Sequence, residues 1–310
     1  MDQTGSSPPY HDPVLVREVV QLLRPVGAGV IVDATFGGGG HTRALLEEMP
    51  GITVLGLDRD PDAAGAAAGL ADRVHFLIAD FRTLADLATE AGIGELSGAL
   101  FDLGVSSHQL DVGERGFSYH IPGPLDMRMG PDAPFSAAEV VNEWPEDRLA
   151  DTIRRYGEER FARRIASVIV RARPVGDTKA LADLVSDAIP APGRRRGHPA
   201  RRTFQAIRIT VNDELAALRE GLAGSLRLLR SGGRIVVISY HSLEDRIVKR
   251  RFARGARGCV CPPDLPVCGC GRPSELRLLT RRVIRPAEDE VARNPRARSA
   301  RLRGAERVAS

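Results

Sequence analysis

A short apolar run that ends in aspartate recurs through the first part of the chain, and a stretch suited to a helix follows each of the first three runs. The runs lie at 30–33, 54–58, 75–80 and 98–102. The segments between them, at 41–49, 61–72 and 84–96, are rich in Ala, Leu and Glu, which suits helices. Strands that alternate with helices at this spacing predict βαβ units and a buried parallel sheet.

The same pattern resumes only late in the chain, which predicts an inserted domain. A strong fifth strand is expected at 232–239, after a helix at 212–230. A crossover between parallel strands needs about a dozen residues, and far more separate this strand from the fourth. Segments 136–172 and 178–189 show apolar residues near helical spacing. We therefore expect an α/β domain in two parts, 1–110 and 206–310, with about the first nine residues flexible, and a mainly helical domain at 111–205.

The predicted sheet places its aspartates where ligands of such sheets bind, outside the carboxyl ends of the strands. Asp33, Asp58, Asp80 and Asp102 all lie at such ends. A purely structural set of caps for the following helices is the alternative, but four in succession favour a binding site. The first turn continues into four glycines, 37–40, which let the backbone approach a ligand at the start of the next helix.

The spacing beyond the glycines suits a cofactor that contains a ribose and an adenine. Asp58 lies some twenty residues further on, where an acid binds ribose hydroxyls, and Phe81 offers an aromatic face for adenine. A nicotinamide cofactor needs a third glycine, where this chain has Thr42 or Arg43. A nicotinamide-dependent enzyme is therefore the runner-up hypothesis, and no phosphate-binding loop of the Gly-x-x-x-x-Gly-Lys-Ser/Thr type occurs.

Basic residues are clustered, although the net charge is only +4. Arginine supplies 42 of the 44 basic residues, and basic residues gather in two runs without acids, one between Asp187 and Asp213 and one at 246–257. Arginine is a favoured partner of phosphate, and a codon bias is the alternative explanation of the excess. The candidates for RNA contacts are Arg194, Arg195, Arg196, Arg201 and Arg202. A non-catalytic RNA-binding module is a third hypothesis.

No segment of the chain suggests export or a membrane. The first residues lack the basic and apolar regions of a signal peptide. No apolar stretch approaches the roughly 20 residues of a membrane span. We therefore expect a cytoplasmic protein without a membrane partner, and the sequence leaves open whether it forms a homodimer.

At the level of whole motifs, the chain resembles the RsmH (formerly MraW) family of bacterial 16S rRNA cytosine-N4 methyltransferases. The matching blocks run through nearly the whole sequence, including the insertion. The blocks are residues 11–15, 33–41, 57–61, 102–107, 114–118, 123–128, 156–161, 203–208, 241–246 and 294–299.

The resemblance implies a class I, Rossmann-like fold that uses S-adenosylmethionine. It also implies methyl transfer to the N4 amine of a decoding-centre, P-site cytidine of 16S rRNA, within the small ribosomal subunit or its precursor. The cofactor contacts that it implies are Gly39, Gly40, His41, Asp58, Phe81, Asp102 and Gln109. One departure lies beside that glutamine, because the family often has proline where this chain has His108.

The residue types also narrow the chemistry of the methyl acceptor. A cytosine amine is a poor nucleophile, and acceptors for its N–H bonds help it to react; Asp102 and Ser106 are the candidate catalytic residues. A role as helix cap is an equal alternative for Ser106. Methylation at pyrimidine C5 needs a cysteine nucleophile, and none lies near the fourth strand. The Asp/Asn-Pro-Pro-Tyr/Phe motif of many amino-methyltransferases is absent, so an amine acceptor is favoured but not proved by the residues.

Three further features remain open at this stage. His241 and Asn212 suit either structural roles or the lining of a pocket. The four cysteines lie close together, at Cys259, Cys261, Cys268 and Cys270. Reduced thiols are the favoured interpretation, zinc the next, and disulfides the least favoured in a reducing cytosol, so the metal content is undecided.

Overall fold

A computed structural model of the chain describes residues 13–70, 72–190, 197–258, 261, 265, 267, 269–271 and 273–309. The expected flexible residues 1–9 and the arginines at 194–196 lie outside these ranges. The chain divides into two compact units, one made of Met1–Gly104 with Ala216–Ser310 and one made of Val105–Leu215. In the part that is described, no helix is long and apolar enough to cross a membrane.

The first unit is built on a seven-stranded sheet with the order β3-β2-β1-β4-β5-β7-β6. The first five strands are parallel in the order 3-2-1-4-5 of a doubly wound, Rossmann-like sheet, which confirms the predicted fold class. β7 runs antiparallel to both β5 and β6. The strands are β1 (Gly29–Asp33), β2 (Ile52–Asp58), β3 (Val74–Ile78), β4 (Leu96–Asp102), β5 (Leu229–Ser239), β6 (Leu276–Leu278) and β7 (Arg301–Arg307).

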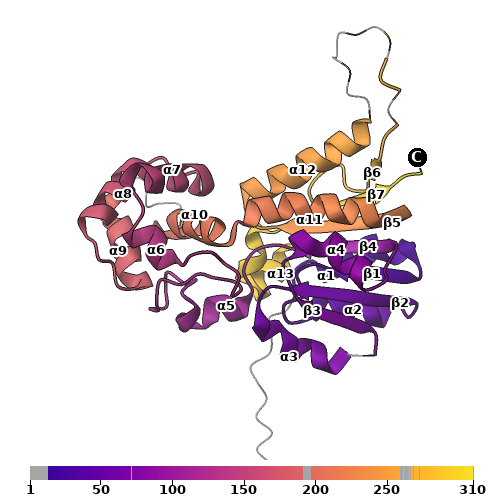
Figure 1. Cartoon of the computed structure of the whole chain (residues 1–310), viewed down its shortest axis with the longest axis horizontal. Helices are drawn as coiled ribbons and strands as arrows, with labels where there is room; N and C mark the ends of the chain where they lie inside the picture. The colour runs from indigo at the N-terminus through magenta and orange to yellow at the C-terminus, as the bar shows by residue number, and fades with distance from the viewer. Residues whose placement is uncertain are drawn as a thin grey trace, which may run out of the picture. The chain divides into compact units, whose positions relative to one another are not determined.

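The central strands of this sheet are buried on both faces, and helices supply the cover (Figure 1). Successive strand residues point to opposite faces, so Val236 and Ile238 join one apolar cluster while Ile235 and Val237 join another. That burial on both sides explains why the central parallel strands are largely apolar instead of alternating. The helices are α1 (Val16–Leu23), α2 (Gly40–Glu48), α3 (Ala64–Ala67), α4 (Leu84–Glu90), α11 (Glu214–Leu228), α12 (Ser242–Arg257) and α13 (Glu288–Arg293).

The second unit is mainly helical and has its own apolar core. Its core includes Leu149, Ile153, Ile165, Ile169 and Ile207, spaced to line one face of each helix. Its helices are α5 (Ser107–Asp111), α6 (Ala137–Asn142), α7 (Glu146–Gly157), α8 (Ala162–Arg171), α9 (Thr178–Ala188) and α10 (Arg201–Asn212).

The expected boundaries of the insertion, 111 and 205, differ from those of the compact unit. α10 packs against α7 and belongs as a whole to the second unit, so a boundary at 205 would cut through a helix. The unit therefore extends from Val105 to Leu215. Periodicity alone does not indicate where a helix changes its packing partners.

Two segments with a helical pattern are interrupted or partly non-helical in the structure. The segment 136–172 forms three helices because Pro145 precedes α7 and Glu158, at φ 49°, ends it in a left-handed conformation. The segment 84–96 is helical only to Glu90, since Gly92 has φ +70° and β4 already begins at Leu96. Strands β6 and β7 were not anticipated, because three and seven residues with several arginines lack the pattern of a buried strand.

Candidate active site

The carboxyl ends of the parallel strands carry the predicted acids. The first of these acids, Asp33, forms hydrogen bonds within the protein. Asp33, at the end of β1, is buried and accepts hydrogen bonds from the Thr42 hydroxyl (2.7 Å) and the Thr35 amide (3.3 Å). Burial raises the pKa of Asp33, and the bond from Thr42 opposes that rise. Asp33 therefore ties the end of β1 to α2, which is the structural role that the sequence left as an alternative.

Asp58, at the end of β2, faces the glycine turn. Its Oδ2 accepts a hydrogen bond from the Gly37 amide at 2.7 Å, and its Oδ1 accepts one from the Asp60 amide at 2.9 Å. Burial raises the pKa of Asp58 to about 6, although both amide bonds favour the charged form. The glycine turn and the second strand end are thus joined by a carboxylate that titrates not far below neutrality.

The turn depends on backbone conformations that glycine adopts readily. Gly37 and Gly39 have φ of +50° and +70°, and Gly39 directly precedes the first turn of α2. A Cβ on Gly39 would lie 2.9 Å from the Phe36 ring, and one on Gly40 would lie 2.9 Å from the ring of Pro13. A side chain at either position would therefore clash with these neighbouring rings of the protein.

We expect Gly39→Ala to lower the free energy of unfolding by about 1–2 kcal/mol, the cost of a left-handed conformation for a residue with a Cβ. Urea denaturation measures the change. Gly65→Ala is the matched control, because Gly65 lies in α3 with nothing within 4 Å of its added Cβ, and alanine is the better helix former. Unchanged stability of Gly39→Ala would show that the turn relaxes without cost.

Asp80 and Phe81 lie just beyond β3. The Asp80 side chain caps the short 3₁₀ helix η4 (Phe81–Thr83) by accepting from the Arg82 amide at 2.9 Å, and it forms ion pairs with Arg82 and Arg59. Its polar atoms are therefore already used within the protein. The half-buried Phe81 ring packs edge-on against Phe101, with centroids 5.4 Å apart.

Asp102, at the end of β4, lies in a hydrogen-bonded cluster. Its Oδ1 accepts from the Tyr240 hydroxyl at 2.9 Å, and its amide donates to the Thr35 hydroxyl at 2.6 Å. The His41 Nδ1 lies 3.6 Å from its Oδ2, while His41 Nε2 donates to the Val14 carbonyl at 2.9 Å. Burial raises the pKa of Asp102 to about 6, and His41 and Tyr240 both act against that rise.

Three further candidate residues, Ser106, Gln109 and Asn212, belong to the second unit. The Ser106 hydroxyl accepts from the Gln109 amide at 3.1 Å, and Gln109 Oε1 accepts from the Ser106 amide at 3.0 Å, so the two cap α5 reciprocally. The helix-cap alternative for Ser106 is thus present. Asn212 is buried and holds the backbone of Met127 and Met129, a structural role.

The predicted RNA-contact arginines are only partly described. Arg194, Arg195 and Arg196 lie outside the described residues. Arg201 and Arg202 are exposed at the start of α10. Arg202 also pairs with the buried Glu159 at 3.5 Å and donates to the Glu158 carbonyl, so it contributes to the packing of its own unit.

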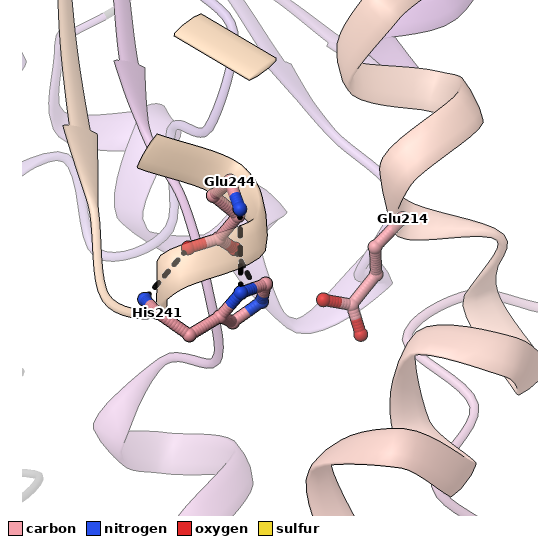
Figure 2. Close-up of side chains that lie close together, drawn as sticks. All are labelled: Glu214, His241 and Glu244. Carbon is pink, nitrogen blue, oxygen red and sulfur yellow. Dashed lines mark hydrogen bonds and ion pairs between the residues drawn. The ribbon is translucent and has the colours of Figure 1, made fainter. Parts of the chain in front are cut away.

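His241 begins α12 as a cap. Its Nδ1 accepts from the Glu244 amide at 3.4 Å, while Glu244 Oε2 accepts from the His241 amide at 3.2 Å, and Figure 2 shows the two side chains meeting at the first turn of the helix. Their reciprocal bonds satisfy amides that a helix start otherwise leaves unpaired. Of the four cysteines for which thiols or zinc were weighed, Cys259 and Cys268 lie outside the described residues.

Tyr240 and Thr35 are the site residues that the sequence prediction missed. β4 and β5 are parallel neighbours with Asp102 opposite Ile238, so Tyr240, two residues further on, comes to lie beside Asp102. The position directly after the fifth strand was a usable signal. No pattern indicated the pairing of a tyrosine hydroxyl with this carboxylate.

Comparison with known proteins identifies the family. A model of the MraW methylase family matches residues 9–308. The chain belongs to the MraW methylase family. Membership confirms the resemblance seen in the sequence, and S-adenosylmethionine is the cofactor of this methyltransferase.

Curated relatives in the family are similar over most of their length. A protein of Symbiobacterium thermophilum named ribosomal RNA small subunit methyltransferase H is 53% identical, over 95% of each chain. Proteins of the same name from Geobacter sulfurreducens and a Mycobacterium species are each 50% identical over 96% of this chain, covering 99% and 84% of their own lengths.

Proposed function

We propose that this MraW-family chain transfers the methyl group of S-adenosylmethionine to the N4 amine of a decoding-centre cytidine in 16S rRNA, in the small ribosomal subunit or its precursor. The observation that carries the proposal is the match of the family model to residues 9–308. It is supported by relatives that are named small-subunit rRNA methyltransferases and align over at least 95% of their length. The choice of cytosine N4 rests on the motifs that resemble the RsmH family.

The residues at the strand ends suit the proposed cofactor. The left-handed glycines keep side chains away from the start of α2, where Gly39, Gly40 and His41 would contact the cofactor. Asp58 would accept hydrogen bonds from ribose hydroxyls, and Phe81 would pack against adenine. Gln109, in the second unit, is proposed as a further contact.

We propose Asp102 as the residue that assists the methyl transfer itself, because the acceptor is a weakly nucleophilic amine. Bound S-adenosylmethionine supplies an electrophilic methyl group, so the protein contributes mainly position and removal of water. An Asp102 carboxylate that accepts an N–H of the cytosine amine would leave the nitrogen lone pair more available. The Ser106 hydroxyl is proposed as a second acceptor. The base must also leave its stack, which costs a few kcal/mol and least where the RNA is already unpaired.

The second unit is proposed to hold the RNA around the target. We expect Arg201→Ala to reduce the slope of log affinity against log salt by about 0.7, the share of one contact with a single-stranded phosphate. Arg201 is exposed and α10 does not depend on it for a cap, so thermal stability should stay unchanged. Arg171→Ala, on the exposed C-terminal end of α8, is the control, and equal slopes for wild type and Arg201→Ala would remove Arg201 from the interface.

The product decides the proposal. Unmodified 30S subunits are incubated with the enzyme and donor labelled in the methyl group, and the RNA is digested to nucleosides. We expect the label in N4-methylcytidine. Label in 5-methylcytidine, in a ribose methyl group or in an adenine would overturn the assignment of the acceptor.

A further inference from the structure

The outer face of α12 carries a row of cationic side chains that the sheet and the site do not use. The helix begins directly after β5 and its cap, at the carboxyl edge of the sheet. Val248, Phe252 and Gly255 are buried on its inner face. The exposed positions opposite them are Arg246, Lys249, Arg250, Ala253, Arg254 and Arg257. At 3.6 residues per turn these positions cover roughly 140° of the helix, and all but Ala253 are cationic.

The acids of α12 do not neutralise this face. Its two acidic residues, Glu244 and Asp245, both lie in the first turn. Glu244 is buried in the helix cap, and Asp245 pairs with Arg303 at 2.7 Å on β7. Within the described part of the chain, no ion pair or hydrogen bond involves the side chains of Lys249, Arg250, Arg254 or Arg257.

Three other helices of the molecule pair an exposed cation with an acid one turn away. Arg154 pairs with Asp151 on α7, Lys179 with Asp183 on α9, and Arg293 with Asp289 on α13. On α12 the corresponding neighbours are cations instead. Like charges at i and i+4 destabilise a helix by about 0.2–0.5 kcal/mol per pair, so the row carries a cost that packing does not explain.

We propose that the outer face of α12, defined by Lys249, Arg250, Arg254 and Arg257, binds the phosphodiester backbone of the RNA substrate; the choice of RNA rests on the proposed function. Guanidinium groups bind phosphate oxygens in a bidentate manner, and such contacts position an RNA without reading its sequence. An anionic membrane is the less suitable partner, because interfacial helices place large apolar side chains in the bilayer, and the apolar face of α12 is buried in the core.

The position of the row agrees with this role. α12 has 16 residues and is therefore about 24 Å long. It starts at the edge of the sheet where the methyl donor is proposed to bind and runs away from it. RNA that flanks the target nucleotide would follow this face of the first unit.

The test compares two triple variants that remove the same charge. Lys249→Gln/Arg250→Gln/Arg254→Gln removes three cations of the row. Arg24→Gln/Arg277→Gln/Arg293→Gln removes three exposed arginines of the same unit that pair with Glu48, Glu306 and Asp289. Binding of a fluorescent 16S rRNA transcript is measured across a salt series, with calorimetry of S-adenosylmethionine as the test of folding.

Each contact with a single-stranded phosphate contributes about 0.7 to the slope of log affinity against log salt. The α12 variant loses three cations, so we expect its slope to fall by about 2. Its RNA binding should weaken at least tenfold at 0.15 M salt. Cofactor affinity should stay within twofold, and the KM for 30S subunits should rise more than kcat falls. The paired-arginine variant should retain the wild-type slope.

Three outcomes would overturn the inference. An unchanged slope in the α12 variant, while wild type binds and methylates RNA, would show that these cations do not bind RNA and would leave the proposed function intact. An equal loss in the paired-arginine variant attributes the effect to net charge. Loss of binding to vesicles of anionic lipid, with RNA binding unchanged, assigns the face to a membrane. Failure of the wild type to bind or methylate RNA contradicts the proposed function itself.

Discussion

Replacing Asp102 with alanine is expected to lower the single-turnover rate of methyl transfer by about 10²–10⁴-fold, the range for loss of a group that handles protons in the transition state. The carboxylate would accept an N–H of the attacking amine, and neither the Tyr240 hydroxyl nor the Thr35 hydroxyl beside it carries a charge. The measurement uses saturating donor and 30S subunits, so that a weaker cofactor affinity does not enter the rate.

The Asp102→Asn variant separates chemistry from folding. Burial raises the pKa of Asp102 from its ordinary value of 3.8 to about 6. The folded state therefore binds the proton more tightly, and this group makes folding less favourable as pH rises from about 4 to 6. A neutral asparagine avoids that cost, so the variant should fold at least as stably as the wild type at pH 7. A wild-type rate in folded Asp102→Asn would contradict the need for a carboxylate.

The pH dependence of the rate gives a second readout. Transfer should rise with pH as Asp102 ionises near pH 6 and then reach a plateau. Tyr240→Phe removes a hydrogen bond that favours the charged form, so the midpoint of the rise should move upward, with little change at pH 8. A rate that falls equally at pH 6 and pH 8 would indicate that Tyr240 acts only through packing.

Asp58→Ala is expected to weaken S-adenosylmethionine binding by about 1.5–3 kcal/mol, the range for hydrogen bonds to a charged group. This corresponds to a dissociation constant roughly ten to a hundred times higher. The structure adds a second cause, because Asp58 also accepts from the Gly37 amide and so holds the glycine turn. Titration calorimetry measures the loss, with Asp86→Ala, an exposed acid of α4, as the control.

An asparagine at position 58 distinguishes the two causes. Its carbonyl oxygen can still accept the Gly37 amide, but it carries no charge, so an intermediate loss is expected. Because burial raises the pKa of Asp58 to about 6, wild-type affinity should increase between pH 5 and pH 7 as the carboxylate forms. A folded Asp58→Ala protein with unchanged affinity would remove Asp58 from the cofactor site.

Local pattern was sufficient for the parallel part of the sheet. The runs of β1, β2 and β4 are largely buried on both faces in the structure. Burial of that kind leaves a continuous apolar segment that can be read from the sequence. The parallel strands then bring their carboxyl ends to one edge, so Asp58 and Asp102 could be assigned to a common site. β6 and β7 escaped prediction because their short, arginine-containing sequences are stabilised by pairing with β5 and with each other.

The sequence by itself determined the fold class, the family and the strand-end acids, because each depends on residue order and spacing. Only the tertiary structure decided what those acids do. Asp33 and Asp80 accept hydrogen bonds from nearby side chains and amides of the protein. Asp102 accepts a hydrogen bond from the hydroxyl of Tyr240, 138 residues away in sequence. Tyr240 and Asp102 meet because β4 and β5 pair. Their hydrogen bond lowers the pKa of Asp102, an effect that the local sequence does not encode.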